Sequence, residues 1–199
     1  KVTGAPKSIK LAKTGSAAIT GTNSCKKLAA LLSTAADSTK DALAQDKKEV
    51  ETFLNNVANS VVKDGSAYSA IKMAVPADYF KQTEDEFSAY TKTLDPSDEA
   101  YGMTFEQFID ALLSAQIKSI TNSVQSIKIS VADLSDCKSK LTADQKQMYA
   151  SCGDIAKAYI AKIKSDVTFK PGADTSGYNT DDLGKITVVN AGGNWYIAG

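Results

Sequence analysis

Hydrophobic positions recur at spacings of three and four in the first half of the chain and at a spacing of two in the second half. Between Ser24 and Lys63 the apolar positions follow a helical period, which predicts one long helix or two helices broken near residues 37–41. After about Ser119 the period changes, and isoleucine and valine alternate with lysine and serine as in a half-buried strand. The pattern therefore predicts helices first and an antiparallel sheet afterwards.

Local signals divide this pattern into elements. A helix over about residues 66–73 ends before Pro76, because the residue before a proline is pushed out of the helical region. Further helices are predicted over 77–94, after a capping box formed by Thr104 and Gln107, and over about 142–150. Strands are predicted over 127–131, 159–169, 185–190 and 194–198. The fold class is α+β, with N-terminal helices packed on a curved antiparallel sheet of about four strands.

The predicted domain organisation is simple. Residues 1–23 are rich in Gly, Ser, Thr, Ala and Lys and read as a flexible tether or a short strand near residues 8–12. Residues 24–199 form a single α+β domain, mainly helical over 24–118 and mainly strands over 119–199. A membrane association is expected only through an N-terminal anchor that is absent from this chain.

Composition removes several classes of function. All 23 basic residues of the 199 are lysines, and the chain contains neither histidine nor arginine. Histidine is the side chain that titrates near neutrality, and arginine alone offers a planar fork for phosphate or carboxylate. With a formal net charge of zero, nucleic-acid binding is not expected, and neither a cofactor nor a metal site is predicted.

Three cysteines bear on the compartment. Cys137 and Cys152 flank one predicted helix, and a disulfide between them would close a loop worth about 3 kcal/mol in the chain-entropy model. The sequence favours this disulfide, with Cys25 left as the odd thiol. Three unrelated reduced thiols are the alternative.

Two segments carry a resemblance to a known family. Residues 141–169 place a short polar helix before a strand that alternates with lysines, and residues 184–199 form a hairpin that closes on Trp195 and Tyr196. Over about residues 50–199 this order resembles exported domains and lipoproteins of Gram-positive bacteria with a nuclear transport factor two-like, or cystatin-like, fold. The resemblance implies a cone-shaped domain of unknown function, secreted or anchored to the outer face of the cell membrane.

Aromatic side chains are the candidate ligand-binding residues of such a cone. Tyrosine and tryptophan offer an apolar body with a polar tip, so an open cone would be lined by Tyr79, Tyr90, Tyr159, Trp195 and Tyr196. Alternation along the last strand points Trp195 inward and leaves Tyr196 more exposed. The alternative interpretation places these rings in the core.

The sequence favours a noncatalytic role, and no catalytic residue is predicted. The expected activity is binding of a small molecule or a protein partner. One alternative is an enzyme of the same fold that uses an aspartate or glutamate with a tyrosine as acid and base. A second alternative is a structural or dimerising module that pairs with another copy through its sheet.

Overall fold

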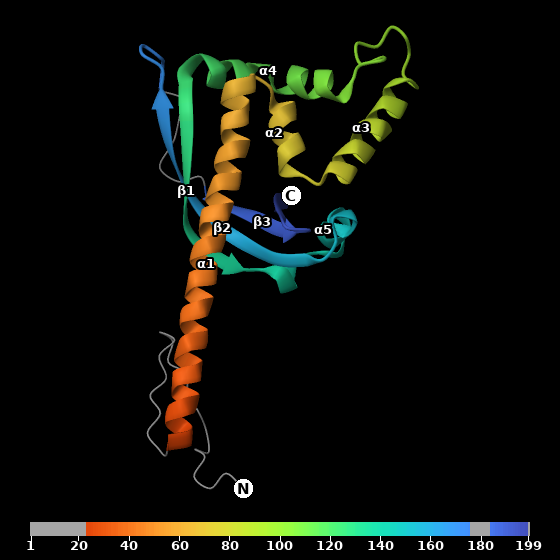
Figure 1. The fold of residues 1–199 in the computed structure, drawn as a ribbon. Coiled ribbons are helices and arrows are strands. Elements are labelled where there is room, and N and C mark those ends of the chain that lie inside the picture. The colour runs from red at the N-terminus through yellow and green to blue at the C-terminus, as the bar shows by residue number, and fades with distance from the viewer. Residues whose placement is uncertain (1–22, 176–183, 199) are drawn as a thin grey trace. The chain divides into compact units, whose positions relative to one another are not determined.

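A computed structural model describes residues 23–175 and 184–198, and the chain divides into two compact units, residues 1–47 and 48–199. The described residues form an α+β fold in which helices precede an antiparallel sheet, as the sequence predicts (Figure 1). The helices are α1 (Asn23–Asp64), α2 (Ala67–Ala74), α3 (Ala77–Thr91), α4 (Phe105–Ser123) and α5 (Ala143–Met148), with 3₁₀ turns η1 (Lys138–Lys140) and η2 (Ala150–Cys152). The strands are β1 (Val124–Asp136), β2 (Ile155–Phe169), β3 (Gly184–Ala191) and β4 (Asn194–Ala198).

In the first unit the described residues, 23–47, all belong to α1. Of the two predicted alternatives, one long helix is confirmed, because α1 continues without interruption through residues 37–41. Ser38 lies within the helix, and its hydroxyl donates to the carbonyl oxygen of Thr34 one turn back at 2.8 Å. The strand expected near residues 8–12 lies outside the described residues, and the tether boundary at residue 23 stays a prediction.

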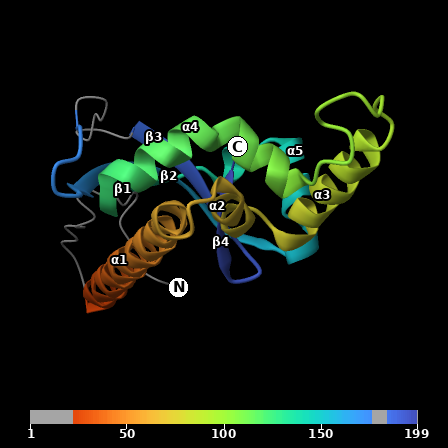
Figure 2. The ribbon, with the colours of Figure 1, turned by 90° about the horizontal axis from the view of Figure 1, so that it is seen from above.

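In the second unit, short sequence signals start and stop the helices. Gly65 adopts a φ of 65° and ends α1, and the Ser66 hydroxyl then caps α2 by accepting from the N–H of Tyr68 at 3.2 Å. Helix α2 ends at Ala74, one residue before the extended Val75 that precedes Pro76. In both views α2 lies between the C-terminal end of α1 and α3 (Figures 1 and 2).

The sheet has the order β1-β2-β3-β4, with every neighbouring pair antiparallel. Strands β1 and β2 are long, and β1 carries irregularities between Val124 and Ser126 and between Val131 and Asp133. Such bulges bend a strand and increase its twist, which accounts for the strong curl of the sheet (Figure 1). The predicted curved sheet of four strands is confirmed.

Both faces of the sheet bury apolar side chains. On the inner face, Val50 and Leu54 of α1 pack against Val131, Val188 and their neighbours in one hydrophobic cluster. On the outer face, the segment η1-α5-η2 covers the opposite side of the same strands with Leu141 and Tyr149. The inner face is therefore filled by a packed cluster that includes residues of α1.

The two edges of the sheet are covered by side chains. Asn55 and Asn59 of α1 each bond both backbone groups of one β1 residue, and Glu51 accepts from a third (distances 2.6–3.0 Å). At the other edge, the hydroxyl of Tyr149 donates to the carbonyl oxygen of Ile197 in β4 at 3.1 Å. Helical elements thus occupy hydrogen-bonding positions on the outer strands that a further strand would use.

Candidate functional site

Two of the five aromatic candidates belong to the core. Trp195 is 8% exposed, and its ring stacks on that of Tyr159 with centroids 6.0 Å apart. The indole N–H of Trp195 donates to the Glu49 carboxylate at 3.2 Å, so the polar tip of the ring is satisfied within the protein. Trp195 points inward as alternation along β4 predicts, but it lies in a packed cluster with α1. These two rings are placed to stabilise the sheet.

Tyr79 and Tyr90 lie on the exposed face of α3. They are 41% and 60% exposed, respectively, and eleven residues apart, so they share one helix face. The adjacent face, about 80° further around the helix, carries Phe80 and Phe87, whose rings contact Phe105 of α4 at centroid distances of 5.8 and 5.4 Å. Tyr79 helps to line a pocket of about 580 Å³ between α3 and α5. The five aromatic candidates are therefore not brought together in one site.

Tyr196 lies in the outer-face cluster with Tyr149, the two rings being 5.9 Å apart. Burial raises the pKa of both hydroxyls, that of Tyr149 to about 12. Both are therefore neutral hydrogen-bonding groups at physiological pH. Tyr149 is fully buried, and sequence analysis missed it because it is the one aromatic residue in a short polar segment.

The predicted disulfide between Cys137 and Cys152 is not formed in the structure. Both cysteines are free thiols that belong to the outer-face cluster. The Sγ of Cys152 is directed at the hydroxyl of Tyr196, 3.7 Å away, and Cys137 is buried in the cluster core. Burial raises the pKa of the Cys137 thiol, which makes it a poor nucleophile. Cys25 lies in α1, and its side chain is outside the described part of the structure.

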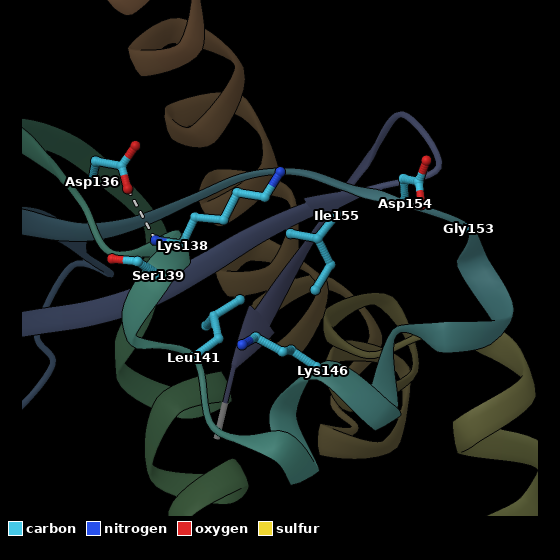
Figure 3. A pocket seen from close by; sticks show the side chains of 8 residues that line it. All are labelled: Asp136, Lys138, Ser139, Leu141, Lys146, Gly153, Asp154 and Ile155. Atoms are coloured by element: carbon cyan, nitrogen blue, oxygen red, sulfur yellow. Dashed lines mark hydrogen bonds between the residues drawn. The ribbon is translucent and has the colours of Figure 1, made fainter.

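The residues next to these two cysteines do form a site. A groove of about 820 Å³ opens at the end of the sheet, between the segment after β1 and the start of β2 (Figure 3). We call it the sheet-end groove, and its lining residues are Asp136, Lys138, Ser139, Leu141, Lys146, Gly153, Asp154 and Ile155. The Cys137/Cys152 spacing and the resemblance over residues 141–169 pointed to these segments in the sequence, but neither predicted a groove.

The sheet-end groove has an apolar floor and a charged rim. Leu141 is buried and Ile155 half-buried, whereas the other lining residues are exposed. The ammonium of Lys138 donates to a carbonyl oxygen of β2 at 3.3 Å. The ammonium of Lys146 has no hydrogen-bond or ion-pair partner among the described residues, and its side chain extends toward Leu141 (Figure 3). Asp154 lies at the opposite end of the groove from Asp136 (Figure 3), so the rim offers both signs of charge.

One tyrosine and carboxylate pair has the composition that the enzyme alternative requires. The Tyr68 hydroxyl on α2 donates a hydrogen bond to the Glu84 carboxylate on α3. This bond, together with burial and the negative charge, raises the pKa of Tyr68 to about 12. A hydroxyl whose pKa lies so far above neutral pH is a poor general acid or base at physiological pH. The pair joins two helices, with Lys72 5.7 Å from the centroid of the Tyr68 ring.

Comparison with known proteins adds nothing to the description of the fold given above. No protein-family model matches it, and no curated protein or solved structure is similar enough to be a match. Within residues 23–175 and 184–198, no helix combines the length and apolar character needed to cross a bilayer. In that same part of the chain, no group of three or more acidic or cysteine side chains is placed to hold a metal ion.

Proposed function

We propose that this protein is a noncatalytic binding module that holds a short peptide segment of a partner protein in the sheet-end groove. The observation that carries the proposal is the combination of an apolar floor, Leu141 and Ile155, with an exposed rim of lysines and aspartates. A peptide supplies apolar side chains, charges of both signs and backbone polar groups in one ligand. The apolar floor complements the first of these, and the lysines and aspartates of the rim complement the second.

The charges around the groove restrict which peptide sequences it is expected to bind. The unpaired ammonium of Lys146 lies beside the apolar floor, so an acidic side chain next to an apolar one is the expected core of the recognised segment. The aspartates at either end favour basic residues farther along it. Because the rim is solvated, the charges contribute more to specificity than to affinity.

The compartment forms part of the proposal. The resemblance of residues 141–169 and 184–199 to exported nuclear transport factor two-like domains supports a role outside the cell, secreted or anchored at the cell surface. Reading the precursor sequence tests this idea, because a secretory signal or lipoprotein signal should precede Lys1. Fractionation of cells that express the precursor should then recover the protein from the medium or the envelope, and recovery from the cytosol would refute it.

A dimer through the outer sheet face is a weaker candidate. The part of that face not covered by α5 carries charges of both signs, with Lys162 lying between Lys185 of β3 and Asp133 of β1. Burying these charges against a copy removes them from water, and the cost of that desolvation opposes association.

Panning tests the peptide proposal directly. The full chain is immobilised and panned with a phage-displayed library of random peptides, and enriched peptides are resynthesised for fluorescence anisotropy. We expect enrichment of peptides with an acidic residue next to an apolar one, and binding to Lys146→Ala that is weaker by about two- to fivefold, as for the loss of an exposed ion pair. The matched control Lys118→Ala changes an exposed lysine on α4 and should bind as the unchanged chain does. Failure to enrich any peptide, or equal binding to both variants, overturns the proposal.

A further inference from the structure

The contact between α1 and β1 has an unusual chemistry. The amide nitrogen Nδ2 of Asn55 donates to the carbonyl oxygen of Ile129, while its Oδ1 accepts from the N–H of the same residue, both at 2.7 Å. Asn59 makes the same pair of bonds with Ile127, at 2.6 and 3.0 Å. The Glu51 carboxylate accepts from the N–H of Val131 at 2.7 Å. These five hydrogen bonds use the outward-pointing backbone groups of β1, to which a neighbouring strand would otherwise bond.

The spacing explains why one helix can do this. Glu51, Asn55 and Asn59 are four residues apart, which corresponds to a rise of about 6 Å per step along a helix. Their targets on β1 are two residues apart, a step of about 6.7 Å along a strand. The two repeats stay in register over two steps, so α1 runs antiparallel to β1 with three side chains as rungs. We call Glu51, Asn55 and Asn59 the edge ladder.

The part of β1 that the edge ladder covers has a sequence that suits antiparallel pairing with a second copy of the same strand. In an antiparallel pair of two β1 strands centred on Ile129, Ile129 would face its own copy and Ile127 would face Val131. Those are the residues whose N–H groups already point outward to the ladder. On the other face Lys128 would lie opposite Ser130, so no like charges meet within residues 126–132. A symmetric contact of this kind satisfies both copies at once.

We infer that the β1 edge is a latent self-association surface, and that the edge ladder keeps it closed in the single chain. Its alternative occupant is β1 of a second copy, in an antiparallel pair about Ile129. This contact lies at the sheet edge and is distinct from a dimer through the sheet face. It is also independent of the sheet-end groove, which no ladder residue lines.

The test removes the amide donors without changing side-chain size. In Asn55→Asp/Asn59→Asp each new carboxylate faces a backbone carbonyl and repels it. The matched control, Asn56→Asp/Asn122→Asp, adds the same charge at exposed helix positions away from the edge. Light scattering after size exclusion should give the ladder variant twice the mass of the control at high concentration. Hydrogen exchange should show protection at Ile129 that now depends on concentration. Equal masses for folded ladder variant and control overturn the inference.

A second measurement serves if the double variant does not fold. A labelled peptide with the sequence of residues 125–133 is titrated against the unchanged chain and against Asn55→Asp. The peptide should bind the variant and not the unchanged chain. The same peptide with Ile129→Pro should bind neither, because it lacks the central N–H. Equal affinity for the unchanged chain and Asn55→Asp, or no binding to either, refutes the inference.

Discussion

The turn between β3 and β4 provides a sharp test of how closely this fold is packed. Gly192 and Gly193 both have positive φ values, 57° and 83°. A Cβ on Gly192 would lie 2.2 Å from the carbonyl oxygen of Cys152, whereas a Cβ on Gly193 would have no heavy atom within 4 Å. Replacing each glycine with alanine therefore applies a similar backbone strain, and only Gly192→Ala adds a steric clash.

The two costs can be estimated separately. Placing alanine in the left-handed region costs about 1–2 kcal/mol, partly offset by about 0.4–1 kcal/mol because alanine restricts the unfolded chain. Gly193→Ala should therefore lower the free energy of unfolding by about 1 kcal/mol. In Gly192→Ala the Cys152 carbonyl must also move by about 1 Å to reach an ordinary contact, and overpacking of this kind costs about 1–3 kcal/mol more. The expected total is about 3 kcal/mol.

Urea unfolding followed by fluorescence measures the difference. Trp195 is the only tryptophan and lies in the core, so it reports directly on the folded sheet. The midpoint should fall more for Gly192→Ala than for Gly193→Ala, with the same slope for both. In thermal unfolding each 1 kcal/mol corresponds to about 2–4 °C for a chain of this size. Equal destabilisation by the two substitutions would refute the proposed close approach.

Three further measurements follow from the described contacts. Tyr149→Phe should lower the free energy of unfolding by about 1 kcal/mol, since the partly buried carbonyl of Ile197 loses its donor, while Tyr90→Phe on the exposed face of α3 should change it little. Iodoacetamide should label Cys152 faster than Cys137, because Cys137 is buried with a raised pKa, and reductant should not be needed for either; equal rates contradict this. The pKa of Tyr68 should be about 12 in an NMR titration, against an ordinary value of 10.0. Its contribution to stability is then full below pH 10 and is lost as the pH rises through about 12, and a value near 10 in the folded protein would be inconsistent with the described hydrogen bond.

Elements with local signals could be predicted from the sequence. The capping box of Thr104 and Gln107 starts α4 as expected, and a second box, at Thr142 and Gln145, starts α5. The last strand has the predicted bounds, Asn194–Ala198. Each of these features depends on residues only a few positions apart, so it can be recognised in the sequence without knowledge of distant contacts.

The edge ladder and the sheet-end groove could not be found in this way. Asn55 and Asn59 read as part of a solvated helix face, because their partners lie 74 and 68 residues away. The groove joins the end of β1 to the start of β2, and neither segment carries a motif. Tyr90 lies apart from Trp195, because the phenylalanines of α3 pack against α4 and leave Tyr90 60% exposed.

The sequence separation of the edge ladder has a consequence for how the chain reaches its native state. Its bonds span 68–80 residues, so α1 cannot dock on β1 until the whole of the intervening chain has been made and the strand has formed. During that interval two nascent chains can meet through the same backbone groups. Refolding yield should therefore fall as protein concentration rises, and concentration rather than temperature should be the first variable to adjust in producing this protein.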